Sequence, residues 1–349
     1  MPNSSPVRFL SRRSFLKQTV AAGMASARWN ARGASTSPRL GHGAFCYRVV
    51  PGWGVLDPST PVQNCHGIVC DREGHLILLT DHTANNVIVY DKAGKLVGKW
   101  GNAFPGAHGL SLVTEGTREV LFITCLKTHR VVKTTLSGEI LEEWRWPEAT
   151  GKYAKESDFR PSWTLHHPDG SFFILDGYGR DYITHHGPDG RFLKIFGGAE
   201  GGIRHWGPHG GLCESTQGTS TLWIAMSDQQ HLLQLSVDGQ ELARIEMPGG
   251  NPRQIRKRGD HYFVAHLGDR WPQERDSRGF VSVVDSAGRV VSNVGGVAPE
   301  YTNEGKLLTM AHEGEVFFHP HDLVIDAEES VYVAQFASQN TYPIKLERV

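Results

Sequence analysis

Three histidines at matching positions of a repeated sequence can together bind a metal ion. His108, His209 and His321 stand in the contexts A-H-G, P-H-G and P-H-D, each at the start of an expected strand. Three neutral imidazoles form a site for zinc or a similar divalent ion and leave one coordination position open for water or substrate. A metal in such a site acts as a Lewis acid. A single histidine at this position is more often a structural residue that bonds a backbone carbonyl.

Six copies of one sequence plan position these histidines. Each copy has two short apolar runs followed by two more that a tight turn joins, and the turns include DKAGK, LSGE, PDGR, VDGQ and SAGR. Their glycines supply the positive φ that hairpin turns need. Copies of about 40 to 50 residues with four strands each are typical of a β-propeller. The sequence therefore predicts an all-β, six-bladed propeller of four-stranded antiparallel blades over residues 41–349.

The innermost strands of a propeller all begin at one mouth of its central channel. Because alternate blades of six lie about 120° apart, histidines from units two, four and six are expected to converge on the axis. Unit one has His66 at the same position, and unit five has Arg253. The convergence depends on the register, since a shift of one residue turns a side chain to the other face of its sheet.

Residues just after the second strand of each unit are expected at the same mouth. These candidates for the pocket are Asp81, His82, Tyr178, Arg180, His266, Asp269 and Arg270. Ordinary turn chemistry explains an aspartate such as Asp81 equally well. His319 is a further candidate, for the pocket rim. The polar segment 266–279 is too long for a hairpin, and we expect it either to cover part of the site, with Trp271 as an apolar wall, or to be a solvated loop.

The first 40 residues predict an export signal and a linker. The segment SRRSFLK at residues 11–17 resembles the twin-arginine motif, and the weakly apolar segment QTVAAGMASA follows it. A small-residue cleavage pattern stands at residues 25–27. We therefore expect the mature protein in a periplasm or outside the cell. That export route carries folded proteins, often with a metal already bound.

Composition narrows the range of partners. The 36 basic and 37 acidic residues leave no basic field for phosphate backbones, so nucleic acid is not an expected partner. Beyond the leader, no stretch approaches the ~20 apolar residues of a membrane span. The five cysteines include no C-x-x-C pair, which excludes a thiolate zinc site of that pattern, although one bridge between Cys65 and Cys70 stays open. The expected partner is a small molecule or a peptide substrate.

Two family resemblances add to this interpretation. Residues 81–87 approximate the D-x-x-N-x-x-V signature of NHL repeats, which form six-bladed propellers. The alternating histidines, together with LDGYGRDYI at residues 175–183, resemble the lyase domain of peptidylglycine α-amidating enzymes over most of residues 60–345. That resemblance implies zinc held by His108, His209 and His321, with Tyr178 as the base. It also implies cleavage of α-hydroxyglycine amides to an amide and glyoxylate.

The chain departs from that family at two positions. The family arginine at the end of the second strand of unit one is absent, because this chain has Thr80, Asp81 and His82 there. The family methionine two residues before the last zinc ligand is His319. The cations available in its place are Arg180, Arg253 and Arg270. Tyr178, Arg180 and Arg253 are accordingly the expected catalytic residues, and the substrate stays open.

Other functions fit parts of the pattern. A non-catalytic propeller that binds a peptide, a glycan or a protein is the main alternative, since a fold does not dictate a function. A calcium-dependent hydrolase would need carboxylate and amide oxygens, and the axial positions supply imidazoles instead. The sequence does not distinguish zinc from iron, manganese or copper. It also leaves open a structural Ca²⁺ in the channel.

Overall fold

The computed structural model describes most of the chain after the expected export signal. The residues described are 38–199, 205–216, 218–268, 271, 273–274, 276–336 and 341–349. The twin-arginine segment and two pocket candidates, Asp269 and Arg270, lie outside this range. Among the described residues, no helix is both long enough and apolar enough to cross a membrane.

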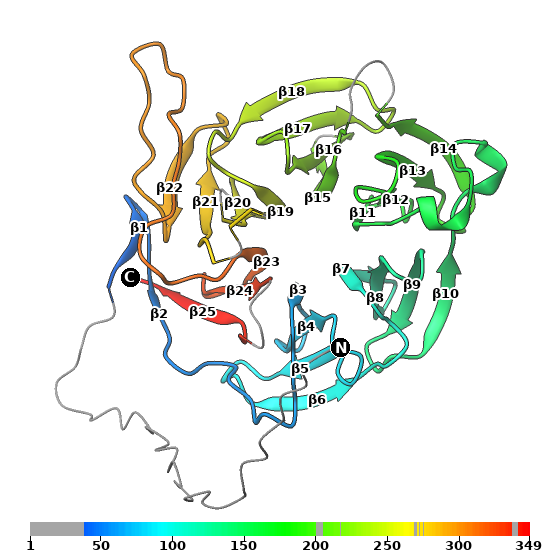
Figure 1. The fold of residues 1–349 in the computed structure, drawn as a ribbon, viewed down its shortest axis with the longest axis horizontal. Helices are drawn as coiled ribbons and strands as arrows, with labels where there is room; N and C mark the ends of the chain where they lie inside the picture. Colours follow the sequence, from blue (N-terminus) through cyan, green and yellow to red (C-terminus); the bar gives the residue numbers. More distant parts are fainter. Residues whose placement is uncertain are drawn as a thin grey trace, which may run out of the picture. The chain divides into compact units, whose positions relative to one another are not determined.

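Six antiparallel sheets surround a central axis, which confirms the predicted six-bladed propeller (Figure 1). Blade one contains β3 (Cys65–Cys70), β4 (Leu76–Thr80), β5 (Val87–Tyr90) and β6 (Leu96–Trp100), and blade two contains β7 (Ala107–Glu115), β8 (Arg118–Cys125), β9 (Arg130–Thr135) and β10 (Ile140–Trp144). Blade three contains β11 (Trp163–His166), β12 (Phe172–Leu175), β13 (Tyr182–His186) and β14 (Phe192–Gly197). Two short 3-10 helices, η1 (Glu148–Thr150) and η2 (Glu156–Asp158), precede blade three.

The second half of the ring repeats this plan. Blade four contains β15 (Pro208–Thr216), β16 (Thr219–Met226), β17 (His231–Ser236) and β18 (Glu241–Glu246). Blade five contains β19 (Pro252–Arg258), β20 (His261–His266), β21 (Phe280–Val284) and β22 (Val290–Val294). Blade six contains β23 (Pro320–Ile325), β24 (Val331–Gln335) and β25 (Ile344–Arg348) from the C-terminal part of the chain. The first strand of each blade is innermost, as Figure 1 shows.

The N-terminal part of the propeller closes the ring. β2 (Phe45–Val49) pairs with β25, with Tyr47 opposite Arg348, and β1 (Leu40–His42) adds an edge strand beyond it. Blade six is therefore built from both ends of the propeller. The repeat pattern did not predict this closure, because the sixth unit contains only three strands of its own.

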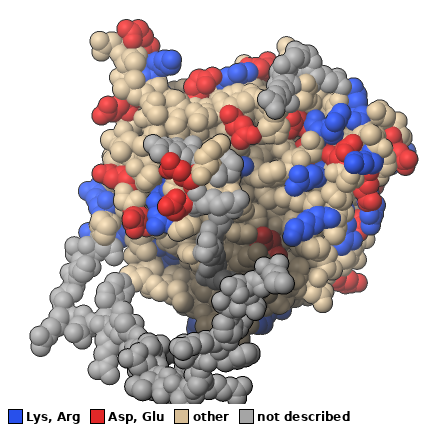
Figure 2. Space-filling model, in the orientation of Figure 1, with Lys and Arg blue, Asp and Glu red and all other residues tan. Residues whose placement is uncertain are grey.

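Burial along the strands follows their distance from the axis. All five residues of β4 are buried, because neighbouring blades cover both faces of an inner strand. The peripheral β6 exposes Leu96 and Val97. Lysine, arginine and acidic side chains are interspersed on the face shown in Figure 2.

Large side chains of the outermost strands join each blade to the next. Trp100, at the end of β6, donates its indole N–H to the carbonyl of Leu136 in blade two, at 2.9 Å. Trp144 makes the same contact with Gly190 of blade three, also at 2.9 Å. The indole of Trp100 lies directly over the turn glycine Gly138. These contacts explain why the hairpin turns carry glycine.

The five cysteines are free thiols. Cys65 and Cys70 are the first and last residues of β3, and an extended strand rises by about 3.3 Å per residue. The two sulfurs are therefore too far apart for the bridge that the sequence left open. Burial raises the pKa of Cys125 to about 12, so that thiol is un-ionised at neutral pH.

We predict that Gly138→Ala destabilises the protein by about 3 kcal/mol. Gly138 has a φ of +95°, and an added Cβ would lie 2.6 Å from the Trp100 ring. The matched control is Gly116→Ala, because Gly116 has a φ of +62° with no atom within 4 Å of an added Cβ. The control should cost only about 1 kcal/mol. Equal losses in chemical unfolding would show that the contact with Trp100 contributes nothing.

Candidate metal centre

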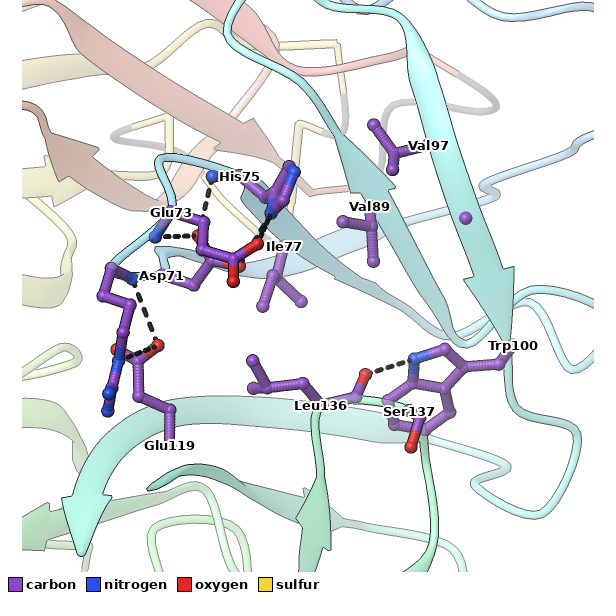
Figure 3. Close-up of a pocket in the computed structure, with 12 residues that line it drawn as sticks. Asp71, Glu73, His75, Ile77, Val89, Val97, Trp100, Glu119, Leu136 and Ser137 are labelled. Carbon is purple, nitrogen blue, oxygen red and sulfur yellow. Dashed lines mark hydrogen bonds and ion pairs between the residues drawn. The ribbon is translucent and has the colours of Figure 1, made fainter. Parts of the chain in front are cut away.

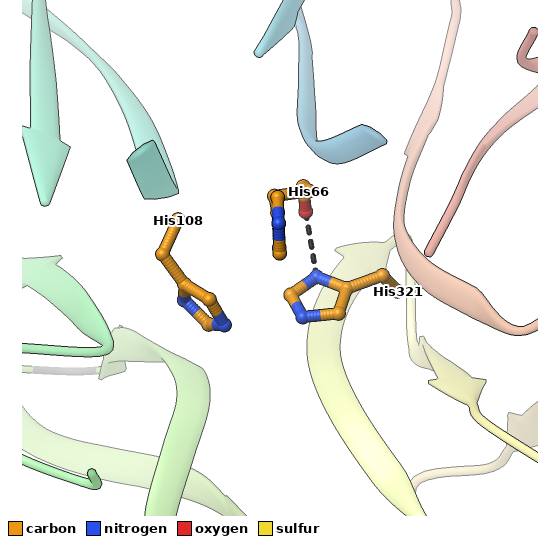
Figure 4. A group of neighbouring side chains, drawn as sticks. All are labelled: His66, His108 and His321. Carbon is orange, nitrogen blue, oxygen red and sulfur yellow. Dashed lines mark hydrogen bonds between the residues drawn. The ribbon is translucent and has the colours of Figure 1, made fainter. Parts of the chain in front are cut away.

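Four imidazoles meet at the axis of the propeller. The ring centres of His108, His209 and His321 lie 4.8 to 4.9 Å from one another. His66 joins from blade one, 4.8 Å from His108 and 4.9 Å from His321. Figure 4 shows His66, His108 and His321 facing one another from three blades. The structure thus brings the three predicted ligands together and adds a fourth imidazole.

A β-bulge aims these side chains into the channel. In blade four, Pro208 pairs with Met226 and Gly210 with Ala225, so His209 is the extra residue between them. Blades one, five and six have the same irregularity around His66, Arg253 and His321, and blade two has a wider one around His108 and Gly109. A bulge bends the strand and redirects the extra side chain, and such bulges are frequent beside active sites.

Each of the three predicted ligands is oriented by the backbone of the next blade. The Nδ1 atoms bond to carbonyl oxygens as follows: His108 to Ser162 at 2.9 Å, His209 to Arg253 at 2.9 Å, and His321 to His66 at 2.7 Å. A carbonyl only accepts, so Nδ1 carries the proton in all three rings. The lone pair is then on Nε2, which is the arrangement that metal-binding histidines use.

The A-H-G and P-H-G contexts follow from these bonds. A Cβ at Gly109 would lie 2.5 Å from the carbonyl oxygen of Ser162. A Cβ at Gly210 would lie 2.5 Å from the carbonyl oxygen of Arg253. These are the same carbonyls that accept the bonds from the preceding histidines. Glycine after the histidine therefore lets the neighbouring blade approach closely enough to orient the ring.

The environment keeps the three rings neutral. Burial lowers the pKa of His108 well below its ordinary value, and the nearby His66 lowers it further. The pKa of His209 is also lowered, mainly by burial and next by the positive charge of Arg253. The pKa of His321 is lowered mainly by burial and next by the neighbouring His108. Neutral imidazole is the form that binds a metal.

Two buried nitrogen atoms fit a bound cation. His108 Nε2 and His66 Nδ1 have no hydrogen-bond partner among the described residues. Their residues are 1% and 5% exposed, and buried polar atoms are rarely left without partners. Ligand atoms of His66, His108 and His321 lie within 4.8 Å of one another. The donor set therefore suits a divalent transition metal.

Tyr178 and Arg253 lie beside the histidines, as predicted. The Tyr178 hydroxyl lies 3.1 Å from His209 Nε2, to which it can donate, and Arg253 Nη1 lies 3.4 Å from the same hydroxyl. Burial raises the pKa of Tyr178, while the charge of Arg253 opposes that shift. The guanidinium of Arg160 is 5.9 Å from the centre of the Tyr178 ring. A phenol and a buried guanidinium thus adjoin one of the predicted ligands.

A pocket of about 280 Å³ opens above this cluster. It is lined by Gly177, Tyr178, His205, Gly207, His209, Ser227, Asp228, Arg253, Leu267, Trp271, His321 and Phe336. Leu267 and Trp271 belong to the polar segment 266–279, so this segment borders the site as one of its two interpretations predicted. The side chains of Leu267 and Trp271 form an apolar wall together with Phe336. The ring centre of Phe336 lies 5.0 Å from that of Trp271.

Side chains of three blades meet near the histidine cluster. The Arg256 guanidinium is 5.8 Å from the ring centre of Trp163, on a different blade. It also bonds the fully buried carboxylate of Asp322 at 2.7 Å. Because Asp322 is already paired, it is not free to bind the structural Ca²⁺ that the sequence left open.

Several predicted pocket residues have other roles. Arg180 is exposed, and His82 accepts a hydrogen bond from the backbone of Ala84. The carboxylate of Asp81 accepts bonds from Asn64 and lies 3.7 Å from His66 Nε2. None of these three residues lines the pocket.

His266 and His319 are also outside the pocket lining. His266 is fully buried and stacks on Phe280 at 4.7 Å. His319 is buried with a φ of +55°. Its Nδ1 accepts a bond from the Gly268 N–H at 3.0 Å. His319 therefore holds the segment that carries Trp271.

His205 and Asp228 are among the pocket residues that were missed in the sequence. Asp228 comes shortly after β16, the second strand of blade four, so the rule that selected Tyr178 also applies to it. His205 comes before the innermost strand of that blade, a position that neither the entry-strand pattern nor the second-strand pattern selects. Both are polar groups of the pocket wall.

A larger cavity of about 530 Å³ lies between blades one and two (Figure 3). Its apolar wall includes Ile77, Trp100 and Leu136. The Glu119 carboxylate in this cavity is paired with Arg72, and that of Asp71 bonds His75. The carboxylates of Glu119 and Asp71 are thus already paired, whereas Arg253 of the axial pocket and the adjoining His66 and His108 each have a buried nitrogen without a partner in the part of the chain that the structure describes. We therefore place the candidate site on the axis.

Comparisons with known proteins identify the fold. No family model and no curated protein matches the chain. A structure of streptogramin B lyase is 13% identical, with a TM-score of 0.57 over 83% of this chain and 95% of that chain. Virginiamycin B lyase from Staphylococcus aureus is 12% identical, with a TM-score of 0.54 over 82% and 96%. A Bacteroides caccae protein of unknown function is 11% identical, with a TM-score of 0.50 over 78% and 90%. These similarities show the propeller fold alone.

We predict that His266→Phe makes the metal-free protein less sensitive to acid. Burial lowers the pKa of His266 to about 3, and neither ring nitrogen has a hydrogen-bond partner among the described residues. The unfolded chain binds a proton below pH 6.5 and the folded chain does not, so this histidine destabilises the fold as pH falls from 6.5 towards 3. The variant should remove up to about 1.4 kcal/mol of that loss per pH unit. Urea unfolding at pH 6.5 and at pH 5 measures this loss of stability. An equal loss in the variant and the wild type would contradict the prediction.

Proposed function

We propose that the protein is an exported, metal-dependent lyase that cleaves the C–N bond of an α-hydroxyamide. The observation that carries the proposal is the set of three cross-blade bonds, which turn three Nε2 atoms to the axis beside Tyr178 and Arg253. A propeller that only binds a partner has no need for such a set beside a phenol. Peptides that end in α-hydroxyglycine are the proposed substrate class.

His108, His209 and His321 are the proposed ligands, because one kind of bond fixes all three rings. The ring of His66 faces Asp81 instead, at 3.7 Å, and we assign it as a neighbour of the metal. A bound divalent ion would act as a Lewis acid and lower the pKa of the substrate hydroxyl.

Tyr178 is the proposed base for the substrate hydroxyl. Its oxygen lies 3.4 Å from Arg253 Nη1, and the guanidinium stabilises the phenolate form that accepts a proton. Arg253 is 6% exposed, and its Nε has no hydrogen-bond partner among the described residues. A buried cation of this kind suits a substrate carboxylate. Arg253 thus takes the place of the arginine that unit one lacks.

We expect about one divalent transition metal per chain in protein purified after its own export. His108→Ala, His209→Ala and His321→Ala should each lose that metal, because two imidazoles hold it far more weakly than three. Elemental mass spectrometry of folded variants tests this. His167→Ala is the matched control, since His167 bonds Ser220 and does not line the pocket. A wild type without transition metal under metal-replete expression would favour the non-catalytic binding propeller.

The variant Tyr178→Phe distinguishes a role in catalysis from a role in metal binding. The variant should keep its metal and cleave an N-acyl-α-hydroxyglycine at least about 100-fold more slowly, the typical contribution of a general base. Unchanged turnover in that variant would remove Tyr178 as the base.

The proposal that the protein is exported depends on the twin-arginine segment at residues 11–17. Arg12→Lys together with Arg13→Lys should keep the protein in the cytoplasm, because the export route reads the arginine pair. Cell fractionation measures this. Normal export of the double variant would overturn the proposed location, while the proposed reaction would stand.

A further inference from the structure

His205 stands at the mouth of the axial pocket between two carboxylates. Its Nδ1 lies 2.8 Å from Asp181 Oδ2, and its Nε2 lies 3.1 Å from Asp228 Oδ2. The Asp181 side chain is 3% exposed and the Asp228 side chain is 59% exposed. Asp181 also accepts the backbone N–H of Trp206 at 2.7 Å. The ring is therefore fixed on its buried side and paired with a solvent-exposed group on the other.

This arrangement suits a proton donor. An ionised carboxylate only accepts hydrogen bonds. In the two contacts of His205, Nδ1–H therefore donates to Asp181 and Nε2–H donates to Asp228. The His205 side chain is 46% exposed, and it lines the pocket together with Tyr178 and Arg253. Because Asp228 is exposed, it can release the Nε2–H to a molecule in the pocket.

The proposed reaction needs such a donor. An amide nitrogen leaves poorly as an anion, so cleavage of the C–N bond requires a proton on that nitrogen. Tyr178 takes the proton of the substrate hydroxyl, and Arg253 stays charged. A donor from another part of the pocket wall would protonate the nitrogen while Tyr178 still holds the hydroxyl proton.

We infer that His205 is the general acid of the C–N cleavage, an inference that rests on the proposed function. Tyr178 removes the proton from the substrate hydroxyl, and the O–H electron pair forms the C=O bond of the aldehyde. The C–N electron pair moves to nitrogen, which takes the Nε2 proton of His205. The products are the amide and the aldehyde acid. Transfer of the Tyr178 proton to His205 through water restores the enzyme.

The test is His205→Gln in the metal-loaded enzyme, with a series of N-aroyl-α-hydroxyglycines whose ring substituents vary the basicity of the leaving amide. The wild-type rate should depend little on this basicity. The variant should lose about 100-fold or more in kcat, and the loss should grow as the amide becomes more basic. KM, metal content and the calorimetric affinity for N-benzoylglycine should stay as in the wild type.

His167→Gln is the matched control, because His167 also has a carboxylate partner, Asp169 at 2.7 Å, but lies outside the pocket lining. It should behave as the wild type does. Wild-type turnover combined with an unchanged leaving-group dependence in His205→Gln would overturn the role of His205 alone. A metal-loaded wild type that leaves the whole series intact would overturn the proposed reaction, and this role with it.

Discussion

The hydrogen bond from an axial imidazole to the carbonyl of the next blade is the constraint on which the site depends. It occurs three times, in alternate blades, and each time it fixes both the tautomer and the direction of a histidine. The ligand geometry is thus a property of how the blades pack. A change in the contact between two blades would misplace a ring that neither blade could orient by itself.

The same packing places a buried ion pair near the histidines. Trp163, Arg256 and Asp322 come from three different blades and contact one another through the Arg256 guanidinium. Asp322 also accepts the Ile68 N–H of blade one at 2.9 Å. The pocket that Tyr178 and Trp271 border opens onto His209 and His321. Burial of Arg253 strengthens its electrostatic effect on neighbouring groups.

The sequence allowed the fold and part of the site to be predicted, because both depend on local repetition. Turn glycines and alternating strands marked the blades, and the shared position of His108, His209 and His321 predicted their convergence. The bulges could not be predicted, since they depend on which residues pair across two strands. His205 was missed for a similar reason, because its partners Asp181 and Asp228 are distant in the sequence and meet it only in the folded ring.

The closure of blade six links the site to the order in which the chain is made. β2 is made before the other blades of the propeller, but its partner β25 follows all the other described strands in the sequence. The bond from His321 to the His66 carbonyl joins the same two blades that this closure brings together. Until β25 is available, β2 has no partner among the C-terminal strands of blade six, and that blade is not tied to the segment that leads into blade one. A complete set of axial ligands therefore joins blades that lie at opposite ends of the propeller sequence.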